Sequence, residues 1–177
     1  MFDNLAVENV LDEILKFDLE GKQIIETSKV SPKTIIDYLD KFTAKGASIV
    51  DAPISGGPEL VFKGDCAVFM GGDQNSAIRA QTSLASISGR IFHVGPLGTG
   101  LVMKVINNSM LQIYVSGLIE MMPLTKKVGL PIETALNILC GGPAGLPLVT
   151  ARIPKILGTN ESVGFTNNGT AKDNDGF

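Results

Sequence analysis

The fold is decided by residues 23–51, which read QIIETSKVSPKTIIDYLDKFTAKGASIVD. Gln23 to Glu26 and Ser48 to Asp51 are short, mostly apolar runs of the kind that form buried strands. Between them, Ser31-Pro32 predicts the start of a helix and Gly46 its end. Because a strand–helix–strand order favours parallel pairing with a right-handed crossover, this stretch predicts one unit of a doubly wound α/β domain.

Further elements of the same type lie on both sides of this unit. They are a helix over residues 6–17 before it and, after a loop at 52–58, a strand at 66–70, a helix over 75–87 and a strand at 90–94. Residues 1–96 are therefore predicted to form one α/β domain.

The second part of the chain has a different pattern. The stretch from Gly95 to Gly100 is rich in glycine and predicts a hinge, and a long apolar segment at helical spacing follows it to about Lys127. Pro123 lies inside this segment and predicts a kink. A further helix is expected over 132–140. Residues 97–177 are therefore predicted to form a helical domain entered through a long helix.

Composition excludes several classes of function. The 18 acidic and 15 basic residues give a net charge of −3 and no basic field, so nucleic acid is not an expected partner. No apolar run approaches the length of a membrane span, and a cytoplasmic location is expected. Cys66, Cys140 and His93 do not have metal-ligand spacing, so no metal site is predicted. The cysteines are interpreted as buried thiols and the histidine as structural.

Lys104 is the first candidate for chemistry. With Asn107 and Asn108 it has the spacing i, i+3, i+4, which places all three side chains on one helix face. Their apolar neighbours predict a largely buried helix, and burial lowers the pKa of a lysine enough for it to act as a general base. The alternative is a solvated lysine on the exposed side of an amphipathic helix.

The second candidate is the loop Ser55-Gly56-Gly57. It follows the strand that ends at Asp51, and ligands of open α/β sheets bind at the carboxyl ends of strands. Two glycines let backbone N–H groups converge on a small anion, and Ser55 adds a hydroxyl donor, so a carboxylate would fit. The alternative is an ordinary turn that needs glycine for its backbone angles.

Several motifs in a fixed order resemble one known family. They are Asp51-Ala52-Pro53-Ile54-Ser55-Gly56-Gly57, Gly71-Gly72-Asp73, His93-Val94-Gly95-Pro96 and Gly98-x-Gly100-x-x-x-Lys104-x-x-Asn107-Asn108. This combination resembles the β-hydroxyacid dehydrogenases, which include 3-hydroxyisobutyrate dehydrogenase and are similar to 6-phosphogluconate dehydrogenase. The resemblance implies a Rossmann-like domain that binds NAD or NADP, a helical substrate and dimerisation domain, a small hydroxycarboxylate substrate and a homo-oligomer.

The resemblance also implies roles for single residues. Lys104 matches the catalytic lysine, Asn107 and Asn108 match the position that orients the substrate, and Ser55, Gly56 and Gly57 match the loop that holds its carboxylate. Cofactor contacts are implied for Ser28, for Lys29, which stands where the family usually has threonine, and for Lys172.

Two functions are consistent with these observations. The first is an NAD(P)-dependent oxidoreductase that transfers a hydride between nicotinamide and a small β-hydroxycarboxylate. The family's glycine-rich N-terminal turn and its last helices have no counterpart in this chain, so the resemblance implies a sequence truncated at both ends. The second function is therefore a catalytically inactive fragment that serves at most as an assembly or binding module.

Overall fold

A computed structural model describes residues 3–159. These residues fall into two compact units, residues 3–108 and residues 109–159. The first contains the whole sheet and the second is helical.

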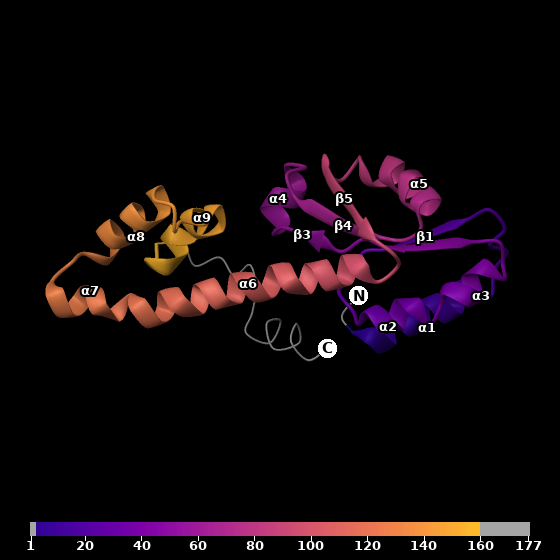
Figure 1. Cartoon of the computed structure of the whole chain (residues 1–177), viewed down its shortest axis with the longest axis horizontal. Helices are drawn as coiled ribbons and strands as arrows, with labels where there is room; N and C mark the ends of the chain where they lie inside the picture. Colours follow the sequence, from indigo (N-terminus) through magenta and orange to yellow (C-terminus); the bar gives the residue numbers. More distant parts are fainter. Residues whose placement is uncertain (1–2, 160–177) are drawn as a thin grey trace. The chain divides into compact units, whose positions relative to one another are not determined.

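The first unit is built on a five-stranded mixed sheet (Figure 1). Its strands are β1 (Gln23–Glu26), β2 (Ser48–Asp51), β3 (Ile54–Ser55), β4 (Ala67–Gly71) and β5 (Arg90–Gly95). β1 and β2 pair in parallel, as the sequence predicted, and β4 and β5 are also parallel. β4 runs antiparallel to both β2 and β3.

Helices cover both faces of this sheet (Figure 1). α1 (Asn4–Ile14), α2 (Pro32–Ile36) and α3 (Leu39–Thr43) pack on one face, and α5 (Gln74–Leu84) packs on the other. The first face is filled mainly by the buried side chains Val7, Leu11, Ile35, Phe42, Ile49 and Leu101, and the second by Val50, Val68, Met70, Ala77, Ala80 and Leu84. The Rossmann-like α/β fold predicted from the sequence is confirmed.

The single helix predicted after Ser31-Pro32 is wrong, because the chain divides there into α2 and α3. The break lies at Tyr38, which is buried, and its hydroxyl donates to Asp12 Oδ1 of α1 over 2.8 Å. This contact holds Tyr38 against α1, at the point where the sequence predicted a continuous helix. Burial, followed by the hydrogen bond to Asp12, raises the pKa of Tyr38 to about 12.

The predicted loop at 52–58 also contains regular structure. β3 lies inside it, and α4 (Pro58–Phe62) begins at its end. β3 forms because Ile54 and Ser55 pair with Val68 and Ala67 of β4, and the N–H of Phe69 donates to the carbonyl of Pro53. These partners lie more than ten residues away along the chain, so the local pattern does not show them.

The second unit begins within α6 (Thr99–Met121) and continues with α7 (Pro123–Val128), α8 (Ile132–Gly141) and α9 (Pro147–Ile156). A kink was predicted at Pro123 inside one long helix; instead, α6 ends at Met121 and Pro123 begins α7 at a position that needs no N–H donor. The prediction of a largely buried long helix is wrong: Gly100 and Leu101 are its only buried residues within the described part of the chain. Apolar side chains such as Ile113 and Ile119 are exposed.

Candidate active site at the start of the long helix

The N-terminus of α6 is capped by a side chain from a distant strand. Gly98, which precedes this helix, has no side chain that could accept a hydrogen bond. Instead, Asp51 at the end of β2 accepts the N–H of Gly98 at Oδ1 over 2.7 Å and the N–H of Leu101 at Oδ2 over 2.8 Å. Two N–H groups that a helix start leaves unsatisfied are therefore paired with one carboxylate.

Asp51 is fully buried, and two opposing effects act on its carboxyl group. Burial raises the pKa of Asp51 because it removes the charge from water, whereas the N–H donors of Gly98 and Leu101 lower it. Burial is the larger effect, and the pKa lies above its ordinary value. The positive end of the helix dipole is the favourable place for such a charge.

Two glycines allow this close packing. A Cβ atom on Gly100 would lie 2.3 Å from the carbonyl oxygen of Phe69, and one on Gly71 would lie 2.3 Å from Asp51 Oδ1. Gly98 has φ +92, an angle that side-chain-bearing residues rarely adopt. Gly98 and Gly100 belong to the predicted hinge. They form a packed junction, in which small residues let the helix start approach the strand ends.

A second contact joins α6 to the strand that follows Asp51. The side-chain amide of Asn107 donates to Ser55 Oγ over 3.1 Å, and both residues are half-buried. The same amide lies 3.4 Å from Asn108 Oδ1. The structure thus brings together Ser55 and the asparagine pair, which the sequence had placed 52 positions apart.

The two glycines of the predicted carboxylate loop differ in their surroundings. Gly56 has φ +152, and a Cβ there would lie 3.0 Å from the Cβ of Cys66, so the fold itself requires glycine at this position. Gly57 has an ordinary φ of −73, and a Cβ there would meet no atom within 4 Å. The fold of the described residues does not need glycine at Gly57, which is exposed.

Lys104 is half-buried on α6. It lies three residues after Leu101 and three before Asn107, so it stands on the helix between the two contacts to the Asp51–Ser55 segment. Asn108 follows four residues later on the same face. The predicted lysine and the predicted loop therefore belong to two segments that are joined on both sides of Lys104.

The residues assigned to the cofactor lie partly at the same edge of the sheet. Ser28 and Lys29 follow the carboxyl end of β1 and are half-buried, and the N–H of Ser28 donates to Glu26 Oε1 over 2.6 Å. Glu26 pairs in register with Asp51, so the ends of β1 and β2 are neighbours. A serine hydroxyl and a lysine ammonium at such an edge suit the phosphate and ribose groups of a nucleotide. Lys172 lies outside the described residues.

The remaining polar candidates have structural surroundings. His93 is exposed, and its Nε2 lies 2.8 Å from the carbonyl oxygen of Gly72, so this nitrogen carries the proton and donates. Cys66 is buried as predicted, but Cys140 is half-buried. Among residues 3–159 there is no group of three or more side chains that could hold a metal ion. The helices described between these limits include none that is long and apolar enough to cross a membrane.

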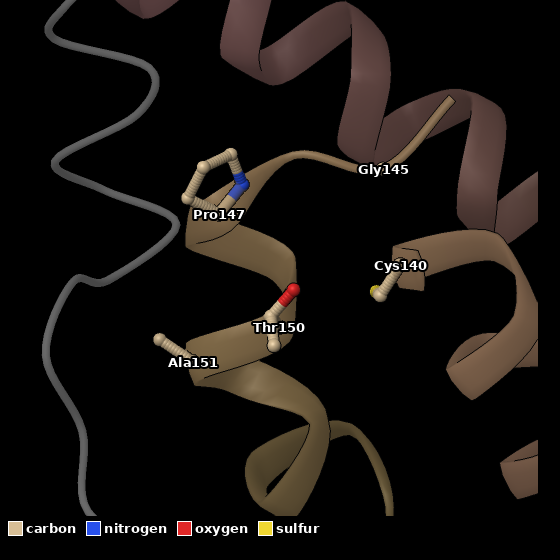
Figure 2. A pocket seen from close by; sticks show the side chains of 5 residues that line it. All are labelled: Cys140, Gly145, Pro147, Thr150 and Ala151. Carbon is tan, nitrogen blue, oxygen red and sulfur yellow. The ribbon is translucent and has the colours of Figure 1, made fainter. Parts of the chain in front are cut away.

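A separate pocket of about 510 Å³ lies inside the second unit, between the end of α8 and the first turns of α9 (Figure 2). It is lined by Cys140, Gly145, Pro147, Thr150 and Ala151. None of the predicted catalytic or binding residues contributes to it.

From the sequence, Asp51 was recognised only as the first residue of a motif, and its contacts with the start of α6 were not predicted. One signal was available: a long helix that starts after Gly98 has no capping side chain of its own, so a carboxylate from elsewhere is expected to supply the missing acceptor. The identity of that carboxylate depends on which strand ends beside the helix, and this is a tertiary property.

The sheet with helices on both faces and the long helix that starts at its edge define a Rossmann-like α/β protein. Two family models match the chain: the NAD-binding domain of 6-phosphogluconate dehydrogenase over residues 2–95, and the NAD-binding domain of NADP-dependent 3-hydroxyisobutyrate dehydrogenase over residues 98–175. The chain belongs to the β-hydroxyacid dehydrogenase family.

Individual relatives agree with this assignment. The chain is similar to 3-hydroxyisobutyrate dehydrogenase of Pseudomonas aeruginosa, with 34% identity over 67% of this chain and 40% of the relative. It is 29% identical to 2-(hydroxymethyl)glutarate dehydrogenase of Eubacterium barkeri over 81% of this chain and 48% of that protein. The chain thus spans about half the length of the curated relatives it matches, or less.

Solved structures show the same fold. A 3-hydroxyisobutyrate dehydrogenase from Mycobacterium tuberculosis, studied with L-serine, superposes with a TM-score of 0.86 at 23% identity and covers 98% of this chain and 62% of its own. An oxidoreductase structure from Mycobacterium avium has a TM-score of 0.74 at 26% identity, over 82% of this chain and 55% of its own.

Proposed function

We propose that the protein is an NAD(P)-dependent dehydrogenase that transfers a hydride between nicotinamide and a small β-hydroxycarboxylate. The observation that carries this proposal is the joining of the Ser55 loop to the helix of Lys104 through the hydrogen bond from Asn107 to Ser55 Oγ. A group that could hold a carboxylate and a group that could accept a proton belong to one packed part of the molecule.

The residues have distinct roles in this proposal. Ser55 Oγ and the backbone N–H groups of Gly56 and Gly57 hold the substrate carboxylate, and the open space beside Gly57 leaves room for it. Asn108, with Asn107 beside it, orients the hydroxyl group. Lys104 takes the hydroxyl proton as the carbinol carbon loses its hydride, and returns the proton when the carbonyl is reduced.

When bound, NAD or NADP accepts the hydride at its nicotinamide ring. Ser28 and Lys29, at the end of β1, are the described residues that would contact it, and Lys172 is proposed to reach it as well. The matches to two NAD-binding family models support this part of the proposal. A cytoplasmic location and a homo-oligomer complete it. The exposed apolar side chains along α6, such as Ile113 and Ile119, support association with a further copy.

The test uses the protein expressed from the complete reading frame that contains this chain. It is incubated with NAD⁺ or NADP⁺ and short β-hydroxycarboxylates, and formation of the reduced nicotinamide is followed by absorbance. We expect turnover with at least one substrate, and Lys104→Ala should lower kcat by about 10²- to 10⁴-fold, the usual contribution of a general base.

Lys126→Ala is the matched control, because Lys126 is an exposed lysine in α7 and has no proposed role. It should leave kcat unchanged. Undiminished turnover in Lys104→Ala would contradict the assignment of the base. Absence of turnover with every hydroxycarboxylate would favour the second candidate, an inactive chain that serves in assembly or binding.

A further inference from the structure

We propose that Asp51 is a positioning residue of this site: its buried carboxylate fixes the first turn of α6 and thereby sets where Lys104 stands relative to the Ser55-Gly56-Gly57 loop. The inference rests on the proposed function and adds to it a residue that acts through others. Asp51 is suited to the task because it belongs to the same chain segment as the loop but makes its hydrogen bonds to the helix.

The geometry is that of two segments joined at two points. At one point Asp51 accepts the N–H of Leu101, and at the other Asn107 donates to Ser55 Oγ. Asn107 lies six positions after Leu101 along the helix, a rise of about 9 Å. Ser55 lies four positions after Asp51 along an extended segment, a span of about 13 Å. The two segments therefore run alongside one another, and Lys104 lies between the points where they are joined.

The contact through Asp51 is stronger than the contact between Asn107 and Ser55. Asn107 and Ser55 are neutral and half-buried, whereas Asp51 is fully buried and receives two N–H donors on separate oxygens. Hydrogen bonds to an ionised acceptor are about twice as strong as those between neutral groups. Gly71 and Gly100 also pack directly against this carboxylate. Loss of Asp51 should therefore release the start of α6, and Lys104 would lose its fixed distance from the loop.

This distance can be tested without the nicotinamide cofactor. Glyoxylate carries an aldehyde and a carboxylate in one small molecule. If the loop holds its carboxylate, the amine of Lys104 adds to the aldehyde carbon and water leaves, which gives an imine. Cyanoborohydride then delivers a hydride to the imine carbon and leaves a stable carboxymethyl group on the lysine. Acetaldehyde follows the same chemistry but has no carboxylate for the loop to hold.

The experiment measures labelling of single lysines by peptide mass spectrometry, in the protein expressed from the complete reading frame. The readout is the ratio of glyoxylate to acetaldehyde labelling at Lys104, divided by the same ratio at exposed Lys126. We expect a value of about 10 or more in the wild type, the factor that one charge-assisted hydrogen bond supplies. Asp51→Asn keeps the size of the side chain but has one oxygen fewer. In this variant the value should fall to about 1.

Asp73→Asn is the matched control. Asp73 caps α5 by accepting the N–H groups of Asn75 and Ser76, so this variant also removes one carboxylate oxygen from a helix start, but on a helix that does not carry Lys104. Its labelling ratio should equal that of the wild type. A purely structural role for Asp51 would lower the stability of Asp51→Asn without changing its labelling ratio. All ratios are measured well below the unfolding temperature of each protein.

The outcomes separate the two proposals. A high ratio that survives in folded Asp51→Asn overturns the role of Asp51 and leaves the proposed function intact. A wild-type ratio of 1 contradicts the carboxylate-binding loop itself, and the inference about Asp51 falls with it. If Asp51→Asn does not fold, amide hydrogen exchange in the wild type decides: the N–H groups of Gly98 and Leu101 should be as protected as the interior of α6. Rapid exchange at both would overturn the inference.

Discussion

α5 and α6 are each capped by an aspartate, but the two caps are built differently. Asp73 stands directly before α5, is exposed, and accepts N–H groups two and three residues further along the chain. Asp51 is buried and caps α6 from 47 and 50 residues away. The local cap of Asp73 stabilises α5 alone. The distant cap of Asp51 stabilises α6 and also joins it to the strand β2. Only the second can position residues on two segments relative to one another.

The largest expected effect of this difference is on stability. Asp51→Ala leaves two buried N–H groups without an acceptor, and each such group costs about 1–3 kcal/mol, so the free energy of unfolding should fall by about 3 kcal/mol or more. Asp73→Ala removes an exposed cap whose N–H donors can turn to water, and the loss should be about 1 kcal/mol. Denaturant unfolding of both variants measures the two values. Equal losses would show that burial of the Asp51 cap has no energetic consequence.

A smaller effect should appear in the pH dependence of the same variants. Burial raises the pKa of Asp51, so the native state binds this proton more tightly than the unfolded state, and the contribution of Asp51 to stability falls as pH rises from the ordinary value of 3.8 through the raised pKa. Hydrogen bonds from Ser76 lower the pKa of Asp73, so its contribution is present above 3.8 and is lost as pH falls through the lowered pKa.

The two carboxylates should therefore give opposite trends. As the solution is acidified towards pH 3.8, the difference in unfolding free energy between the wild type and Asp51→Asn should widen, and below 3.8 the difference for Asp73→Asn should shrink. Unfolding measured at several pH values provides the comparison. The same trend in both variants would contradict the physical cause given for one of the two pKa shifts.

Much of the fold followed from the sequence, because strands, helices and their order depend on local patterns. The parallel pairing of β1 with β2 and an interruption of the long helix near Pro123 could both be predicted. The short strand β3 could not, since it exists only through its pairing with β4. The break at Tyr38 was missed for a related reason: it depends on a hydroxyl contact to Asp12 in another helix.

The candidate site shows the same division. Lys104 and Asn107 were predicted to share a helix face from their spacing, and Ser55 was predicted to follow a strand. The contact between Ser55 and Asn107, and the cap that Asp51 provides, depend on how the end of β2 meets the start of α6. The close packing of this junction could not be predicted, because a sequence does not show what a Cβ atom at Gly100 would meet.

In the proposed function, a hydride passes directly from a β-hydroxycarboxylate to the nicotinamide. The most direct measurement uses 3-hydroxyisobutyrate labelled with deuterium on the carbon that bears the hydroxyl group, and determines the mass of the reduced nicotinamide formed by the protein expressed from the complete reading frame. We predict that each reduced nicotinamide carries one deuterium atom. Reduced nicotinamide without deuterium, or no reduction with this or any other short β-hydroxycarboxylate, would contradict the account.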